Sequence, residues 1–235
     1  MGQRPTLPTE ELIMKNNHIL YKFRKIDKFA IDILVNKRLY LSSWSTLNDP
    51  HEAEMMIKTK DCNIHANPRR LQDIDKHFFN RGFIDESLMN PKLCSLSSIW
   101  SSNLLWSHYT TGQCGIAIGV TLPVLDQSIN ELIIKYDDKV PTITRCPLKK
   151  EDILNALRHK SKEWKYEKEV RLVTFEPKRN YIENIEITEI NFGLRTSEDD
   201  IRLIYNILKN TGVHFFKTCL KPGSYNLNKA DIPWL

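Results

Sequence analysis

The chain has few glycines and no apolar run long enough to cross a membrane. It contains 8 glycines in 235 residues, and those at positions 112, 115 and 119 match neither G-x-G-x-x-G nor a phosphate-binding loop. No stretch approaches the roughly 20 apolar residues that a transmembrane helix needs. The first residues lack the apolar core of a secretory signal peptide. We therefore expect a cytoplasmic protein without a membrane-bound part.

Cysteine is also sparse. The chain has 5 cysteines, an odd number, and they are far apart without a Cys-x-x-Cys pair. This spacing indicates neither a disulfide framework nor a zinc knuckle, so we expect reduced thiols and no bound metal. The Gly-x-Ser-x-Gly frame of a nucleophile elbow is absent around Ser95 and Ser97, which argues against a serine hydrolase.

The charge is mildly basic but not concentrated. The formal net charge is +5, with 27% charged and 41% hydrophobic residues, as in ordinary globular proteins. Lys149–Lys150, Arg69–Arg70 and Lys162–Lys168 are the basic clusters. A dedicated nucleic-acid binder more often carries one basic stripe. The balance permits contact with phosphates or nucleic acid without requiring it.

Short β-branched and aromatic stretches outnumber amphipathic helical ones, without regular β-α alternation. We predict one α+β domain over residues 18–235 with a mixed or antiparallel sheet and flanking helices, preceded by a flexible lead-in over residues 1–17. Residues 51–90 read as a helical insertion after the second strand. Predicted strands cover 18–23, 38–43, 93–97, 115–120, part of 129–136, 164–175, 181–192 and 213–219. Predicted helices begin at caps Asp27, Ser101 or Asn103, and Ser197, and a long one covers Lys149–Lys165.

The main prediction of function comes from the stretch Trp164–Phe175. As a strand, it places Glu167, Glu169 and Arg171 on one face. Two close carboxylates repel each other, so we expect one to have a raised pKa while Arg171 keeps the other ionised. General acid-base catalysis or electrostatic stabilisation needs this arrangement. The alternative is a solvated edge strand with a local salt bridge.

Several motifs in sequence order resemble the bacterial family catalogued as domain of unknown function 2971, from about His18 to the C-terminus. They are specific together, although each is weak alone. The family name implies an architecture rather than an activity. The motifs are Ile19–Arg24, Leu41–Ser43, Leu47–Glu52, Cys94–Ser97, Leu105–Tyr109, Gly115–Ile118, Trp164–Arg171 and Ile190–Gly193.

The strand–helix–strand opening is similar to that of ADP-ribosyltransferase-like folds. The similarity implies NAD as substrate, with a cation on the first strand, a hydroxyl on the second and a glutamate on a later strand that stabilises the sugar's positive charge. It departs from that pattern because no His or Arg directly follows Tyr21. The implied roles fall on Lys22 or Arg24, on Ser42 or Ser43, on Tyr109 against the nicotinamide, and on Glu169 or Glu167.

Two further motifs allow alternatives. Trp106 and Tyr109 share a helix face beside His108, so they form either a stacking wall with a catalytic His108 or ordinary core. Asp49 in Asn48-Asp49-Pro50 either caps a turn or joins Glu52, Glu167 and Glu169 in a metal-dependent nuclease. A non-catalytic nucleotide- or RNA-binding module is the third class.

We predict that the residues named above line one cleft. We expect an NAD-consuming transferase or glycohydrolase, with a nucleic acid or a protein as acceptor, acting as a toxin or phage-defence effector. Glu169, Glu167 and His108 are the catalytic candidates. The binding candidates are Tyr21, Lys22, Arg24, Ser42, Ser43, Asn48, Asp49, Trp106, Tyr109 and Arg171.

Overall fold

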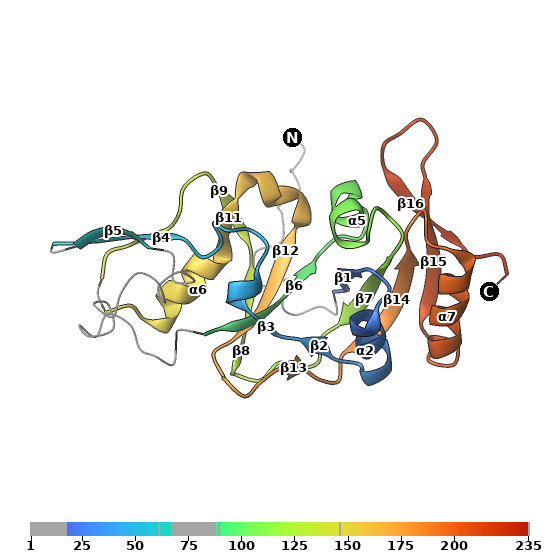
Figure 1. Cartoon of the computed structure of the whole chain (residues 1–235), viewed down its shortest axis with the longest axis horizontal. Helices are drawn as coiled ribbons and strands as arrows, with labels where there is room; N and C mark the ends of the chain where they lie inside the picture. The colour runs from blue at the N-terminus through green and yellow to red at the C-terminus, as the bar shows by residue number, and fades with distance from the viewer. Residues whose placement is uncertain (1–17, 61, 67–87, 89, 146, 235) are drawn as a thin grey trace, which may run out of the picture.

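A computed structural model describes residues 18–60, 62–66, 88, 90–145 and 147–234 of the chain. Within these residues it is an α+β protein built on a nine-stranded sheet (Figure 1). The predicted lead-in and the larger part of the predicted insertion lie outside the described residues. No described helix is both long and apolar enough to span a bilayer.

The sheet is mostly antiparallel, with strand order β16-β15-β14-β7-β1-β6-β12-β8 and β3 added beside β6. Its one parallel pairing in the described chain joins β14 to β15. The strands are β1 (Leu20–Arg24), β3 (Ser42–Ser43), β6 (Lys92–Ser97), β7 (Ile116–Thr121), β8 (Ile129–Ile133), β12 (Glu169–Thr174), β14 (Glu186–Phe192), β15 (His214–Leu220) and β16 (Leu227–Asp231).

Smaller pairings lie around this sheet. They are β2 (Leu39–Tyr40) with β13 (Tyr181–Ile182), β9 (Lys135–Asp137) with β11 (His159–Ser161), and β4 (Met55–Thr59) with both β5 (Cys62–Ala66) and β10 (Thr142–Ile143). The described helices are α2 (Lys28–Asn36), α5 (Asn103–Tyr109), α6 (Lys150–Arg158) and α7 (Glu198–Leu208), with 3₁₀ helices η1 (Trp44–Thr46) and η4 (Lys162–Glu167).

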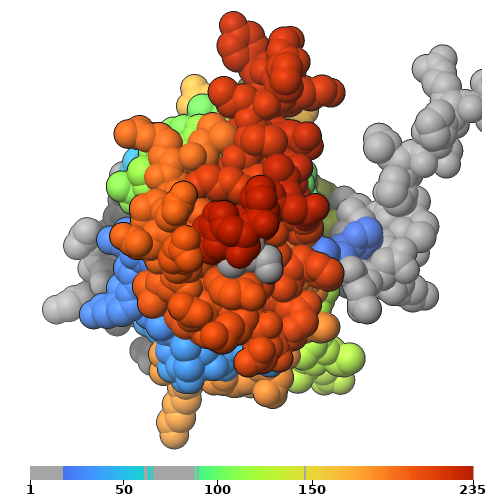
Figure 2. All heavy atoms as spheres, turned by 90° about the vertical axis from the view of Figure 1, so that its right-hand side faces the viewer, coloured from blue at the N-terminus to red at the C-terminus, as the bar shows by residue number. Residues whose placement is uncertain are grey.

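Alternating side chains give the sheet two buried faces. On one face, Ile116, Ile118 and Val120 of β7 share a core with α2 and α7. On the other, Ala117 packs with α5, and Val173 of β12 packs with α6. Figure 1 places α6 and the β4–β5 hairpin at one end of the molecule and α7 with β15 and β16 at the other. Figure 2 views the latter end, which the C-terminal segment largely covers.

Helix starts follow the predicted caps closely. The Asp27 side chain accepts from the backbone N–H groups of Phe29 and Ala30, and the Ser197 side chain accepts from Asp200. For α5 the cap is Ser102, between the two predicted positions. These short polar side chains satisfy donors that have no partner inside the helix.

Three predictions of local structure were wrong. Met55–Thr59 and Cys62–Ala66, inside the predicted helical insertion, are the paired strands β4 and β5 rather than helix. The predicted helix over Lys149–Lys165 ends at Arg158, because residues 159–161 pair with β9. The predicted strand from Trp164 begins at Glu169, after η4 and a left-handed Lys168 with φ 46°. In each case the structure differs from the prediction because of a contact or a cap that the period of hydrophobic residues does not reveal.

The sheet is split between β1 and β6. In the described chain these strands pair at one position, Tyr21 opposite Ser97, whereas β1 pairs with β7 along all five of its residues. Two residues of β3 pair with Lys92 and Leu93 at the other end of β6. The intervening edge of β6 spans about 13 Å at the usual rise of a strand. This opening positions the candidate site.

Candidate functional site

A cleft of about 790 Å³ occupies the split in the sheet. Side chains of β6 alternate between the faces, and Cys94, Ser95, Leu96 and Ser97 all line the cleft. The cleft is therefore lined from both faces, by α2 on one and by α5 and η4 on the other. This size is within the range of pockets that hold small molecules and cofactors.

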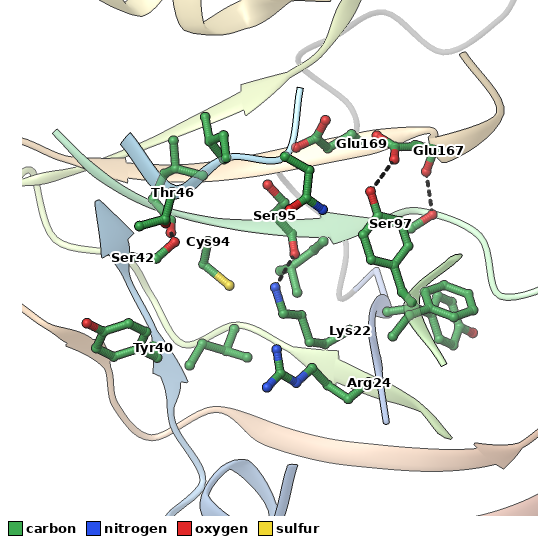
Figure 3. Close-up of a pocket in the computed structure, with 18 of the residues that line it drawn as sticks. Lys22, Arg24, Tyr40, Ser42, Thr46, Cys94, Ser95, Ser97, Glu167 and Glu169 are labelled. Atoms are coloured by element: carbon green, nitrogen blue, oxygen red, sulfur yellow. Dashed lines mark hydrogen bonds between the residues drawn. The ribbon is translucent and has the colours of Figure 1, made fainter. Parts of the chain in front are cut away.

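Lys22 crosses the split. Its Nζ atom donates a hydrogen bond to the Ser95 carbonyl oxygen at 2.8 Å, and Figure 3 shows this contact in the middle of the cleft. Arg24 lies beside it, on the same face of β1. The two side chains place positive charge at the point where β1 and β6 separate.

Glu167 lines the opposite end of the cleft and is almost fully enclosed. Its Oε1 atom accepts from the Tyr109 hydroxyl at 2.7 Å, and its Oε2 atom accepts from Lys160 Nζ at 2.6 Å. The Ser97 hydroxyl donates to its backbone carbonyl oxygen at 2.6 Å. Burial raises the pKa of Glu167, an effect that Lys160 opposes without cancelling. The side chain is thus fixed in place and holds its proton to a higher pH than an ordinary glutamate.

Glu169 lines the cleft beside Glu167, but its pKa is shifted in the opposite direction. Arg171 donates to both of its oxygens, from Nε at 2.7 Å and Nη2 at 2.9 Å, and Lys160 donates at 3.1 Å. Burial by itself would raise the pKa of Glu169, but Arg171 and Lys160 lower it below its ordinary value. Glu169 therefore stays ionised.

Glu52 completes a buried network of five charges. It lies 3.0 Å from Lys160 Nζ and 2.9 Å from Arg171 Nη2. Burial disfavours both cations, but the carboxylates around them raise the pKa of Lys160 and of Arg171 above their ordinary values. Three carboxylates and two cations leave one excess negative charge when all five ionise, next to the cleft.

Most of the predicted site residues lie together in the structure. Glu169 and Arg171 share a face of β12, as the strand period predicts. β12 is an interior strand with both faces buried, so the alternative of a solvated edge strand was wrong. The candidates that line the cleft are Tyr21, Lys22, Arg24, Ser42, Asn48, Asp49, Tyr109, Glu167 and Glu169.

Four candidates lie outside the cleft lining. Trp106 is fully buried, contacts Phe23 edge-to-face and donates to the Trp100 carbonyl oxygen, so it is core. His108 is exposed and bonds to the Tyr166 hydroxyl at 3.0 Å. The Ser43 hydroxyl caps η1. Arg171 is fully buried behind Glu169 and acts on the cleft through it.

Lys160 is the main residue that the sequence reading missed. Lys160 falls inside the helix predicted over Lys149–Lys165, where a lysine indicates only a solvated face. In the structure its ammonium joins Glu52, Glu167 and Glu169, three of the four carboxylates that the nuclease alternative assigns to a metal. No group of three or more His, Cys, Asp or Glu residues in the described chain is arranged to hold a metal ion.

The Asp49 side chain stabilises a turn, one of its two predicted roles. Its Oδ1 atom accepts from the His51 backbone N–H at 2.9 Å, in the turn that leads to Glu52. No helix follows this turn in the structure, since β4 comes next. The turn therefore positions Glu52 rather than capping a helix.

Residues 105–172 match the family model described as "Protein of unknown function (DUF2971)". The matched segment contains Tyr109, Lys160, Glu167, Glu169 and Arg171, the side chains at the carboxylate end of the cleft. No curated protein and no solved structure matches the chain. None of these comparisons shows a relation to ADP-ribosyltransferases.

Proposed function

We propose that the protein cleaves the bond between nicotinamide and ribose in NAD and transfers the ADP-ribosyl group to water or to another acceptor. The observation that carries the proposal is the charge layout of one cleft. An ionised Glu169 and a proton-binding Glu167 lie at one end, and Lys22 and Arg24 lie along it. A dinucleotide needs cations for its pyrophosphate and an anion for its reacting sugar.

Glu169 has the properties of an electrostatic stabiliser. When the bond between the ribose C1′ atom and the nicotinamide nitrogen breaks, its electron pair goes to nicotinamide and the ribose becomes an oxocarbenium ion. A carboxylate fixed nearby in a water-poor site lowers the energy of that cation. Arg171 and Lys160 keep Glu169 ionised and oriented before the substrate arrives.

Glu167 has the properties of a general base. The acceptor's O–H or N–H group attacks the C1′ atom and must lose its proton, and a carboxylate with a raised pKa is suited to take it. The Tyr109 hydroxyl and the Lys160 ammonium hold its two oxygens in place. Nicotinamide leaves as a neutral molecule, so its departure needs no proton donor.

Nicotinamide release from NAD tests the proposal. The purified protein should release nicotinamide, measured by liquid chromatography, with water, nucleic acid or protein offered as acceptor. Glu169→Gln and Glu167→Gln should each slow the release by about 100-fold or more, within the range for removal of an acid-base or charge-stabilising group. Glu163→Gln, which alters an exposed carboxylate in the same η4 segment, is the matched control and should keep the full rate.

Absence of nicotinamide release with every acceptor would refute the proposal. Thermal melting of each variant separates a lost charge from a lost fold. If wild-type protein binds NAD without turning it over, and Glu169→Gln changes nothing, the non-catalytic binding module is the better description.

A further inference from the structure

The end of the cleft farthest from the carboxylates has three aromatic rings. Phe29 of α2 and Tyr40 of β2 line the cleft although 55% and 54% of their surfaces are exposed. Tyr181 lies opposite Tyr40 in the β2–β13 pair, with the ring centroids 5.5 Å apart and the planes at 63°. Exposed apolar surface that gathers around one hollow is typical of a ligand-binding groove.

Cations accompany these rings. The Arg24 guanidinium lies 5.5 Å and Lys28 Nζ 5.1 Å from the centre of the Phe29 ring. The Arg38 guanidinium lies 3.8 Å from the Tyr181 ring, but its charge is paired with Asp32. Lys22, Arg24 and Lys28 also line the cleft and add positive charge near these rings, with Asp27 beside Arg24.

Arg24 has an unused donor. Its Nε atom is buried and has no hydrogen-bond partner among the residues that the structure describes, and its Nη2 atom is 3.6 Å from Asp27. Buried donors are nearly always satisfied, so this N–H group next to the cleft is a donor with which a bound anion can pair. A guanidinium is suited to the paired oxygens of a phosphate.

We propose that this end of the cleft is a binding site for a nucleoside diphosphate, with the base against Phe29, Tyr40 and Tyr181 and the phosphates on Arg24 and Lys22. The assignment rests on the proposed function, in which the ADP half of NAD must lie away from the reacting ribose. Figure 3 shows Lys22 and Arg24 between Tyr40 at one end and Glu167 at the other. Phosphates at the middle would place the base and the reacting sugar at opposite ends.

The arrangement favours a single nucleotide over a polynucleotide. Single-stranded nucleic acids are held by successive aromatic platforms along a basic groove. Here the rings surround one hollow whose wall continues into the buried side chains Ile33 and Leu39. A single apolar wall of this kind offers stacking for one base.

Calorimetric titration with ADP, AMP and adenosine tests the site without any turnover. ADP should bind more tightly than adenosine. Tyr40→Ala and Phe29→Ala should weaken both ligands by roughly 5-fold to 100-fold, the range that base–aromatic stacking carries. Arg24→Met should weaken ADP by about 10-fold or more and leave adenosine nearly unchanged. Tyr225→Ala removes a ring that is 95% exposed outside the cleft, and it should bind ADP as the wild type does.

The outcomes separate this site from the proposed function. ADP binding that depends on Tyr40 and Arg24 supports the site even if NAD is never cleaved. If NAD is cleaved but ADP does not compete and Tyr40→Ala leaves KM unchanged, the site is refuted. A short single-stranded oligonucleotide that binds more tightly than ADP, and loses binding in the same variants, would also overturn it. The mutated rings are half-exposed, so circular dichroism should show an intact fold.

Discussion

Lys22 Nζ donates to the Ser95 carbonyl oxygen at 2.8 Å, across the gap between β1 and β6, which pair at one position in the described part of the chain. Lys22→Met removes this donor and a charge from the cleft. We expect KM for NAD to rise roughly 10-fold to 100-fold, the value of a hydrogen bond to a charged group, while kcat changes little. Steady-state kinetics of nicotinamide release measure both. The free energy of unfolding should change by less than about 1 kcal/mol, because the Ser95 carbonyl borders an open cleft.

The pH dependence of nicotinamide release should follow Glu167. Burial raises its pKa above the ordinary 4.5, and a general base is active when ionised. The rate should therefore be low at pH 4 and rise through an inflection above 4.5. Glu169 has a lowered pKa and stays ionised above pH 4, so it adds no second inflection to the pH–rate profile. The residual activity of Glu167→Gln should show no such inflection, and an unchanged profile in that variant would assign the proton to another group.

The raised pKa of Glu167 also makes the free energy of unfolding depend on pH. A carboxyl group whose pKa is higher in the folded protein than in the unfolded chain binds more protons when folded. Its contribution is therefore favourable below pH 4.5 and is lost as pH rises through the raised pKa. Urea unfolding of wild type and Glu167→Gln between pH 4 and 7 should show the wild type losing stability relative to the variant. A difference that is constant over this range would contradict the assignment.

Arg171 should be among the most sensitive positions for stability. Its side chain is fully buried and donates to Glu169 and to the Leu157 carbonyl oxygen at 2.9 Å, besides its contact with Glu52. Arg171→Met leaves two buried carboxylates with Lys160 as their remaining cation. Breaking a buried ion pair from one side costs about 3–5 kcal/mol. Urea unfolding measures this loss, and Arg202→Met, at an exposed position on α7, should change stability by about 0.5 kcal/mol or less.

Gly115 is a steric requirement at the start of β7. A Cβ atom there would lie 2.2 Å from the Arg24 carbonyl oxygen and 2.9 Å from Thr110 Cβ. Gly115→Ala should therefore cost about 1–3 kcal/mol and displace the end of β1, which carries Arg24. Gly223→Ala has free space around its Cβ but a φ of +70°, so we expect a cost of about 1 kcal/mol or less. Equal thermal shifts in the two variants would show that the contact at position 115 relaxes easily.

The strands and caps were largely readable from the sequence, because short β-branched runs and Asp or Ser caps are local signals. Val170, Leu172, Glu169 and Arg171 alternate as predicted once β12 has begun. The errors arose where non-local pairing decided the structure. The segment His159–Ser161 follows a helix without a break in the hydrophobic pattern, yet it pairs with β9 and brings Lys160 to the carboxylates.

The meeting of several strand ends in one cleft could be predicted only in part. The ends of β1, β3 and β12 could be expected to meet, because each carries polar residues at its end. The split between β1 and β6 could not, since it depends on β3 replacing β1 beside β6. The exposed rings of Phe29 and Tyr40 looked like ordinary helix and strand positions, so sequence gave no reason to assign them to a ligand.

The single pairing between β1 and β6 also bears on how the molecule opens. Each neighbouring pair of strands from β16 to β1, and again from β6 to β8, is joined along a ladder, with one register shift between β14 and β7, so the sheet consists of two halves with little cross-strand bonding between them. Amide hydrogen exchange often resolves such contiguous units as separate foldons. In the unliganded protein, amides of β7 and β14 should lose protection at a different urea concentration from those of β12. A dinucleotide lying across the split would bind both halves at once, and its presence should merge the two steps into one.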